Sequence, residues 1–120
     1  MPDTQFALKL IYRANIFVVN RAHPALQMGR DDNNDIVVVS LFASRVHARV
    51  EAREGQFVLV DLSSNGTFVL PDGLAEEREA ELRLRQEEMI LTGRGWLGMG
   101  RSASKHGDHS VRFMLQAESS

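Results

Sequence analysis

Residues 29–67 have the sequence GRDDNNDIVVVSLFASRVHARVEAREGQFVLVDLSSNGT, in which short apolar runs alternate with turns of small polar residues. The runs 36–39 (IVVV) and 57–60 (FVLV) are rich in β-branched and aromatic residues, which favour strands. Polar clusters such as 31–35 (DDNND) and 63–66 (SSNG) are typical of turns. Short strands at this spacing predict a β-sandwich or a β-barrel.

Two segments have apolar residues that alternate with polar or charged ones. The segment 46–53 (VHARVEAR) alternates between apolar and polar residues, which predicts a strand with Val46 and Ala48 facing the core and His47 facing outward. The segment 80–85 (AELRLR) consists of strong helix formers, but its apolar residues alternate with charged ones. We predict a strand there, with a helix as the alternative.

Further runs of strand formers lie on both sides of residues 29–67. They are the segments 6–11, 16–19, 26–28, 67–70, 89–91, 96–99 and 111–115. We therefore expect a single all-β domain over residues 1–120, with a core from about 6 to 115 and a frayed tail at 116–120. The large side chains that we expect in this core are Phe57, Phe68, Trp96, Met99 and Phe113.

The composition excludes several classes of function. The net charge is −2, so the chain has no global positive field, and we expect no nucleic-acid partner. The absence of cysteine excludes disulfides, thiolate metal sites and cysteine nucleophiles. No apolar run approaches the roughly 18 residues of a membrane helix, and the first 20 residues lack the plan of a signal peptide. We therefore expect a cytoplasmic protein without a membrane partner.

Small polar residues and arginines gather at three turns. A phosphomonoester has nearly two negative charges and three strong acceptor oxygens, so a phosphate site needs at least one cation and several neutral donors. The residues that meet these needs, if the turns converge, are Arg30, Ser44, Arg45, Ser64 and Asn65. Taken singly, each of them is also an ordinary turn or surface residue.

In order, however, these residues match the motif of a known family. The order Gly29-Arg30, a polar loop, Ser44-Arg45-x-His47 and then Asp61-x-Ser63-Ser64-Asn65-Gly66-Thr67 closely resembles the forkhead-associated (FHA) domain. The resemblance implies an eleven-stranded antiparallel β-sandwich whose loops at one end bind phosphothreonine in an extended peptide. It therefore implies a binding module of signalling proteins, with a threonine-phosphorylated protein or peptide as partner and without a cofactor.

The resemblance also implies a role for each motif residue. Arg30 corresponds to the arginine that pairs with the phosphate, and Ser44 to the serine that hydrogen-bonds a phosphate oxygen. Arg45 adds a second cation. Ser64 and Asn65 correspond to the pair that holds the peptide main chain beside the phosphothreonine.

Other motif residues are expected to support the site rather than to touch the ligand. They are Gly29, His47, Gly66 and Thr67. The histidine corresponds to one that braces the loops from beneath, and Gly66 permits the turn after Asn65.

Family members commonly select the third residue after the phosphothreonine through the loop before Ser44. In this chain that loop contains Leu41 and Phe42, so we expect an apolar or weakly selected residue at that position. Residues 82–95 (LRLRQEEMILTGRG) are similar to FHA domains attached to bacterial adenylate/guanylate cyclase-type proteins.

Alternatives to phosphopeptide binding remain open. The sandwich face is an alternative surface for an interaction or oligomerisation that does not depend on phosphate. The segment 106–109 (HGDH) lacks the spacing of known metal sites, so we expect no metal. No nucleophile or acid partner accompanies His47 at a recognisable spacing, so we expect no enzymatic activity from these residues.

Overall fold

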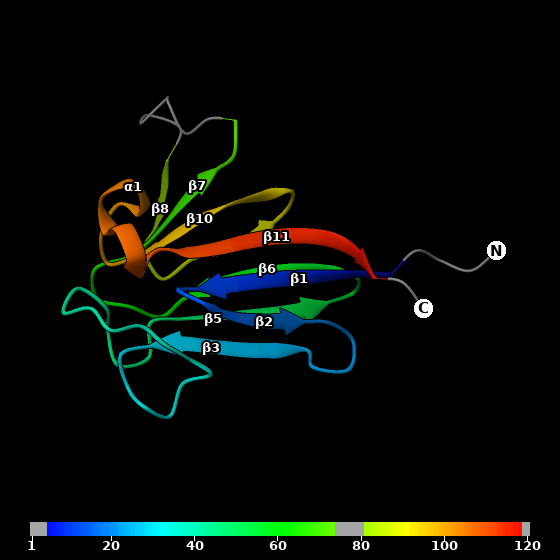
Figure 1. The fold of residues 1–120 in the computed structure, drawn as a ribbon, viewed down its shortest axis with the longest axis horizontal. Coiled ribbons are helices and arrows are strands. Elements are labelled where there is room, and N and C mark those ends of the chain that lie inside the picture. The colour runs from blue at the N-terminus through cyan, green and yellow to red at the C-terminus, as the bar shows by residue number, and fades with distance from the viewer. Residues whose placement is uncertain (1–4, 74–80, 119–120) are drawn as a thin grey trace.

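The computed structural model describes residues 5–73 and 81–118, which form two β-sheets packed face to face (Figure 1). The strands are β1 (Gln5–Tyr12), β2 (Asn15–Val19), β3 (Ala25–Gly29), β4 (Ile36–Val37), β5 (Ala48–Arg53), β6 (Gln56–Asp61), β7 (Thr67–Pro71), β8 (Leu82–Leu84), β9 (Glu88–Leu91), β10 (Arg94–Met99) and β11 (Val111–Glu118). A one-turn helix, α1 (Ala103–His106), and a 3-10 turn, η2 (Gly107–His109), connect β10 to β11. No helix among these residues is long and apolar enough to cross a bilayer.

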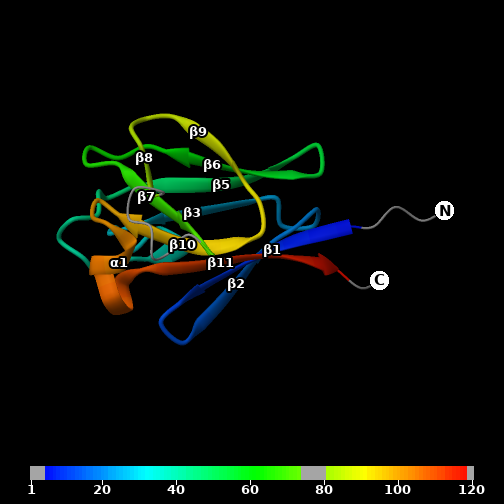
Figure 2. The same cartoon turned by 90° about the horizontal axis from the view of Figure 1, so that it is seen from above.

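The strand order in the two sheets confirms the predicted β-sandwich. One sheet has the order β2-β1-β11-β10-β7-β8, and the other has the order β4-β3-β5-β6-β9. Figure 2 shows them as two layers, with β3, β5 and β6 in one and β1, β2 and β11 in the other. The sheets are antiparallel except for β3 and β4, which pair in parallel through Met28–Ile36 and Gly29–Val37.

The inner faces of the two sheets share one apolar core. Leu8, Leu97 and Phe113 from the six-stranded sheet and Val50 and Leu59 from the five-stranded sheet are all almost completely buried. Burying apolar surface is the main favourable contribution to folding, so this shared core is what holds the layers together.

Three of the five large side chains expected in the core are buried there, namely Phe57, Met99 and Phe113. The expectation is wrong for Trp96, which is 38% exposed, and Phe68 is only half-buried. Trp96 is paired with Leu70 on one side and with Arg112 on the other, and it lies on the outer face of its sheet. The neighbouring Leu97 faces the core instead, because successive side chains of a strand alternate between its two faces.

The strand predicted over 80–85 is shorter in the structure, where Glu81 and Arg85 lie outside it. Leu82–Leu84 forms β8 at the edge of the six-stranded sheet and pairs with β7, so the helix alternative does not apply to these residues. Residue 80 lies outside the described residues. Within β8, Leu84 is buried and Leu82 is 49% exposed.

The prediction for 46–53 is correct from Ala48 onward and wrong for the two residues before it. Strand β5 begins at Ala48, whereas Val46 is 37% exposed and His47 is fully buried. Residues 46 and 47 belong to the preceding loop. A period of two describes side-chain direction only within an extended strand, so it does not apply to them.

The closing strand is longer than the sequence suggests. Beyond residue 115, β11 continues to Glu118 and pairs with β1, with Gln116 opposite Ala7 and Glu118 opposite Gln5. The Asn20 side-chain amide donates a 2.9 Å hydrogen bond to the carboxylate of Glu118. Residues 116–118 are therefore strand rather than frayed tail, and residues 119–120 lie outside the described residues.

Candidate functional site

Three loops converge at the end of the sandwich that is opposite to the chain termini (Figure 1). They are residues 30–35 after β3, residues 38–47 between β4 and β5, and residues 62–66 between β6 and β7. The backbone N–H of Arg30 donates to the carbonyl of Ser44 at 2.9 Å, which joins the first two loops. The N–H of Ser64 donates to Oγ of Ser44 at 3.2 Å, which joins the second loop to the third.

Gly29 and Asn34 hold the first loop against the second. A Cβ at Gly29 would lie 2.2 Å from the carbonyl oxygen of Arg45, so only glycine permits this approach. The buried Asn34 amide donates to the carbonyl oxygens of Asp31 at 2.8 Å and of Arg45 at 2.7 Å. The sequence gives no sign of the role of Asn34, because asparagine in a polar loop also fits an ordinary turn.

His47 braces the second and third loops from beneath. Its Nδ1 accepts the backbone N–H of Ser44 at 2.9 Å, so the proton of the neutral ring is on Nε2. Nε2 then donates to the carbonyl of Gly66 at 2.9 Å. Burial lowers the pKa of His47, although the bond to Gly66 and the nearby charge of Asp61 oppose this shift. The ring is therefore held neutral in a fixed tautomer.

Asp61 organises the third loop from below. Its Oδ1 accepts the hydroxyls of Ser63 at 2.6 Å and of Thr67 at 2.7 Å, and its Oδ2 accepts the N–H of Gln86 at 2.7 Å. Ser63 Oγ in turn accepts the N–H of Gly66 at 2.8 Å. Burial of Asp61 opposes its ionisation, but the bonds from Gln86, Ser63 and Thr67 outweigh burial and lower its pKa. A buried carboxylate therefore fixes the turn.

Asn65 forms hydrogen bonds with two other segments of the chain. Its side-chain amide donates to the carbonyl of Phe42 at 3.4 Å, and its own carbonyl accepts Nη2 of Arg83 at 2.6 Å and Nε at 3.1 Å. The guanidinium of Arg83 lies 5.2 Å from the centre of the Phe68 ring. Gly66 follows with φ of +91°, a conformation that L side chains rarely adopt. The sequence offers no way to find Arg83, because it belongs to β8, far from the loop along the chain.

The five residues predicted to bind the ligand lie on these loops and face solvent fully or in part. They are Arg30, Ser44, Arg45, Ser64 and Asn65. Among the described residues, no side-chain hydrogen bond or ion pair involves the guanidinium of Arg30 or of Arg45. Two uncompensated cations beside hydroxyl and amide groups make a site suited to an anion with several oxygens.

The segment 106–109 spans the end of α1 and η2, which connect β10 to β11. Among the residues that the structure describes, no group of three histidine, aspartate or glutamate side chains is placed to hold a metal ion. The ring of His109 instead meets the hydroxyl of Tyr12 through Nδ1 at 3.1 Å. The same hydroxyl accepts the backbone N–H of Val39 at 2.9 Å, so it ties η2 to the second loop.

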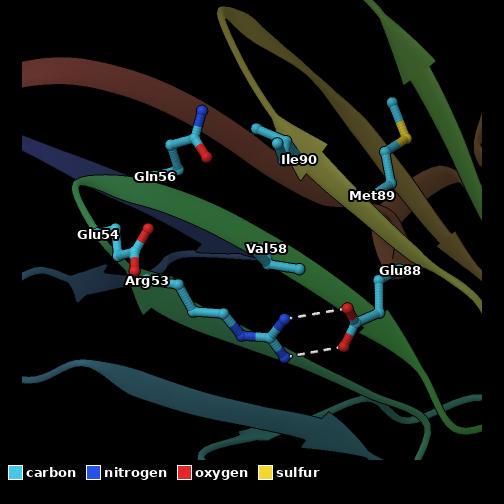
Figure 3. Close-up of a pocket in the computed structure, with 7 residues that line it drawn as sticks. All are labelled: Arg53, Glu54, Gln56, Val58, Glu88, Met89 and Ile90. Carbon is cyan, nitrogen blue, oxygen red and sulfur yellow. Dashed lines mark hydrogen bonds and ion pairs between the residues drawn. The ribbon is translucent and has the colours of Figure 1, made fainter.

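A shallow pocket lies on the five-stranded sheet, away from the loops (Figure 3). It is lined by Arg53, Glu54, Gln56, Val58, Glu88, Met89 and Ile90. The guanidinium of Arg53 forms two hydrogen bonds with the carboxylate of Glu88, at 3.0 and 2.8 Å. Because these opposite charges neutralise each other, the pocket offers a weaker case for ligand binding than the loops.

Comparisons with known proteins agree with this geometry. A family model described as the FHA domain matches residues 26–93, which include the three loops. No match was found among curated proteins.

Solved structures with the same architecture cover nearly the whole chain. The FHA-1 domain of Rv1747 from Mycobacterium tuberculosis is 18% identical, with a TM-score of 0.67 over 92% of this chain and 97% of that one. EmbR from Mycobacterium tuberculosis, in complex with a low-affinity phosphopeptide, is 25% identical, with a TM-score of 0.65 over 96% of this chain and 25% of that one. The MEK1 FHA domain, in complex with the HOP1 pThr318 peptide, is 18% identical, with a TM-score of 0.62 over 93% of this chain and 97% of that one.

Proposed function

The chain belongs to the FHA domain family, and from that premise we propose that it is a phosphothreonine-dependent protein-binding module of a signalling pathway. The observation that supports this function most directly is the pair of uncompensated guanidinium groups, Arg30 and Arg45, on loops that also hold Ser44. A phosphate dianion is the common biological group that needs both cations and hydroxyl donors at one place. The MEK1 relative was solved with a phosphothreonine peptide, which is consistent with this ligand class.

Each exposed loop residue has a role in the proposed complex. Arg30 and Arg45 pair with the phosphate oxygens, since guanidinium groups form strong charge-assisted hydrogen bonds with phosphate. The hydroxyl of Ser44 donates to a third oxygen. Ser64 and Asn65 hold the peptide main chain beside the phosphothreonine.

The supporting residues keep these groups in place before the ligand arrives. Gly29 allows the first two loops to touch, His47 and Gly66 join the second loop to the third, and Thr67 donates to the buried Asp61. Rigid, preorganised groups lose less entropy on binding, which raises affinity. A single phosphate with a few main-chain bonds should still give only micromolar affinity, on the order of −8 kcal/mol.

We propose that the 120 residues act as one binding domain without catalytic activity of its own. Its place would be a bacterial, cytoplasmic signalling protein, with the likeness of residues 82–95 pointing to an adenylate/guanylate cyclase-type partner or attached enzyme. The partner that the loops recognise is then a threonine-phosphorylated protein.

Replacing Arg30 tests the proposed site. The probe is the best-binding member of a phosphothreonine peptide library, titrated by calorimetry with and without its phosphate. Arg30→Ala should weaken binding about tenfold to a hundredfold, because charge-assisted hydrogen bonds are each worth about 1.5–3 kcal/mol.

The matched control is Arg21→Ala. The exposed Arg21 belongs to the turn between β2 and β3. This turn lies at the end of the sandwich that holds the termini (Figure 1). This variant should bind as tightly as the wild type. Equal affinity of Arg30→Ala and wild type, or binding that persists without the phosphate, would overturn the assignment.

A second function is favoured by an exposed apolar surface. The outer face of the six-stranded sheet exposes Ile16 (60%), Val18 (39%) and Trp96 (38%). Strands β1 and β11 separate Ile16 and Val18 on β2 from Trp96 on β10. Because a partner that covers this face would bury all three side chains, the face is the candidate for docking that does not depend on phosphate. Treating a captured partner with phosphatase separates the two functions, since only docking on the sheet would survive.

A further inference from the structure

The segment after β10 returns to the binding loops. The N–H of Gly100 donates to the carbonyl of Gly66 at 2.9 Å, which places this segment directly against the third loop. A Cβ on Gly100 would lie 2.0 Å from the carbonyl oxygen of Phe42, so the segment also touches the second loop. Gly100 is therefore wedged between two of the three loops of the site.

Arg101 follows and lies on the exposed aromatic ring of the second loop. Its guanidinium carbon is 5.0 Å from the centre of the Phe42 ring, and the ring remains 46% exposed. A guanidinium over an aromatic ring is attracted by the negative face of the ring, and this attraction does not require its N–H groups to donate to a hydrogen-bond acceptor. The contact with Phe42 therefore positions Arg101 without using its hydrogen-bonding capacity.

The charge of Arg101 is uncompensated among the described residues. No ion pair or side-chain hydrogen bond of Arg101 is present there, and the nearby carboxylate of Glu81 accepts the N–H of Ala103 at 2.9 Å. Arg83 differs, because two of its nitrogens donate to the carbonyl of Asn65 and its role is thereby structural. Arg101 is therefore a third available cation on the segments that meet at these loops, with Arg30 and Arg45.

Arg101 is placed to contact the peptide rather than the phosphate. Phe42 lies two residues before Ser44, and its carbonyl accepts the side-chain amide of Asn65 at 3.4 Å. Since Asn65 is assigned to the peptide main chain beside the phosphothreonine, a cation that lies over Phe42 is placed to meet a flanking residue of the bound segment.

We infer that Arg101 binds a carboxylate of the ligand, so that the recognised class is a phosphothreonine peptide with an acidic residue near the phosphothreonine. This inference rests on the proposed function and makes Arg101 a specificity-determining residue of the same site. It differs from the expectation from Leu41 and Phe42 alone, which was an apolar or weakly selected residue at the third position after the phosphothreonine. The ring of Phe42 serves instead as the surface over which the guanidinium lies.

The test is a phosphothreonine peptide library in which each flanking position is varied in turn. Wild type should enrich Asp and Glu at one flanking position by up to about fivefold, the upper end of the range expected for a solvent-exposed ion pair. Arg101→Gln should abolish this enrichment, and Arg101→Glu should favour Lys and Arg at the same position. The charge-matched control Arg21→Gln should select the same peptides as the wild type.

The outcomes separate this inference from the function on which it rests. If wild type requires the phosphate but shows no acidic enrichment, or if the enrichment survives in Arg101→Gln, the inference is wrong and the proposed function stands. If wild type binds phosphorylated and unphosphorylated libraries equally, both are wrong. Arg101→Gln should unfold at the same urea concentration as the wild type, since the side chain is exposed, so lost selectivity is not lost folding.

Discussion

His47 is the residue through which two of the binding loops depend on one another. Both ring nitrogens are used, Nδ1 as acceptor from Ser44 and Nε2 as donor to Gly66. A second proton on the ring would place an N–H against the N–H of Ser44 in a buried site. Protonation therefore opposes the folded arrangement, which agrees with the lowered pKa of this histidine.

The stability of the protein should fall as the pH falls below about 6.5. The pKa of His47 is lowered from 6.5 in the folded state, chiefly by burial. Between the two pKa values the unfolded chain binds a proton that the folded chain does not, so acidification favours unfolding. We expect the midpoint of urea unfolding to be lower at pH 5.0 than at pH 7.5.

The control for this pH effect is His47→Gln, which keeps an amide donor and acceptor but does not titrate. The difference between wild type and variant isolates the contribution of His47 from that of the other histidines. Asp61, whose pKa is lowered from 3.8, stabilises the fold above that pH and loses its effect only in more acidic solution. An equal pH dependence in both proteins between pH 7.5 and 5.0 would contradict the role of His47.

At the scale of elements, the candidate site consists of loops at the ends of strands, and hydrogen bonds hold these loops together. Strands β3, β5, β6 and β10 all have an end at these loops, and the segment after β10 touches both the second and the third loop through Gly100. The contact at Gly100 therefore links the segment after β10 to the geometry of the proposed phosphate site.

A methyl group at Gly100 should disturb this link. Gly100→Ala combines an unfavourable backbone conformation, with φ of +81°, with a clash against the carbonyl of Phe42. We expect a loss of stability of about 2–4 kcal/mol, since overpacking alone costs about 1–3 kcal/mol. Phosphopeptide binding should weaken as well, because the loop that holds Phe42 has to move. Urea unfolding and calorimetry measure the two effects.

Gly73 provides a matched control for this substitution. Its φ is +83°, but no atom lies within 4 Å of the position that a Cβ would occupy. Gly73→Ala therefore has the backbone cost of about 1 kcal/mol without the clash. Equal losses of stability in the two variants would show that the contact between Gly100 and Phe42 has no effect.

At the scale of the whole molecule, the two sheets depend on the same core and should unfold together. Leu59 of the five-stranded sheet and Leu97 of the six-stranded sheet are both completely buried in it. We expect Leu59→Ala and Leu97→Ala each to lower the free energy of unfolding by about 2–5 kcal/mol in a single transition. Trp96 fluorescence and far-UV circular dichroism should report the same midpoint.

Leu62→Ala is the control, because this leucine is 39% exposed and should cost less than about 1 kcal/mol. Separate transitions for the two probes would mean that the sheets fold independently. That result would contradict the single cooperative domain that we propose.

The sequence by itself determined the parts of this protein that depend on neighbouring residues. Apolar runs and turn residues predicted most of the strands, and the motif order from Gly29 to Thr67 predicted both the fold and five candidate binding residues. Alternation succeeded inside β5, where the backbone is extended and paired. These features follow from local backbone preferences, which a sequence records directly.

Only the tertiary structure decided the features that depend on residues far apart in the chain. It buried His47, which alternation had placed on the surface, because the ring finds its partners in two different loops. It also brought Arg83 to Asn65 and Arg101 to Phe42. Such contacts arise when the two sheets close over their common core, so no local pattern predicts them.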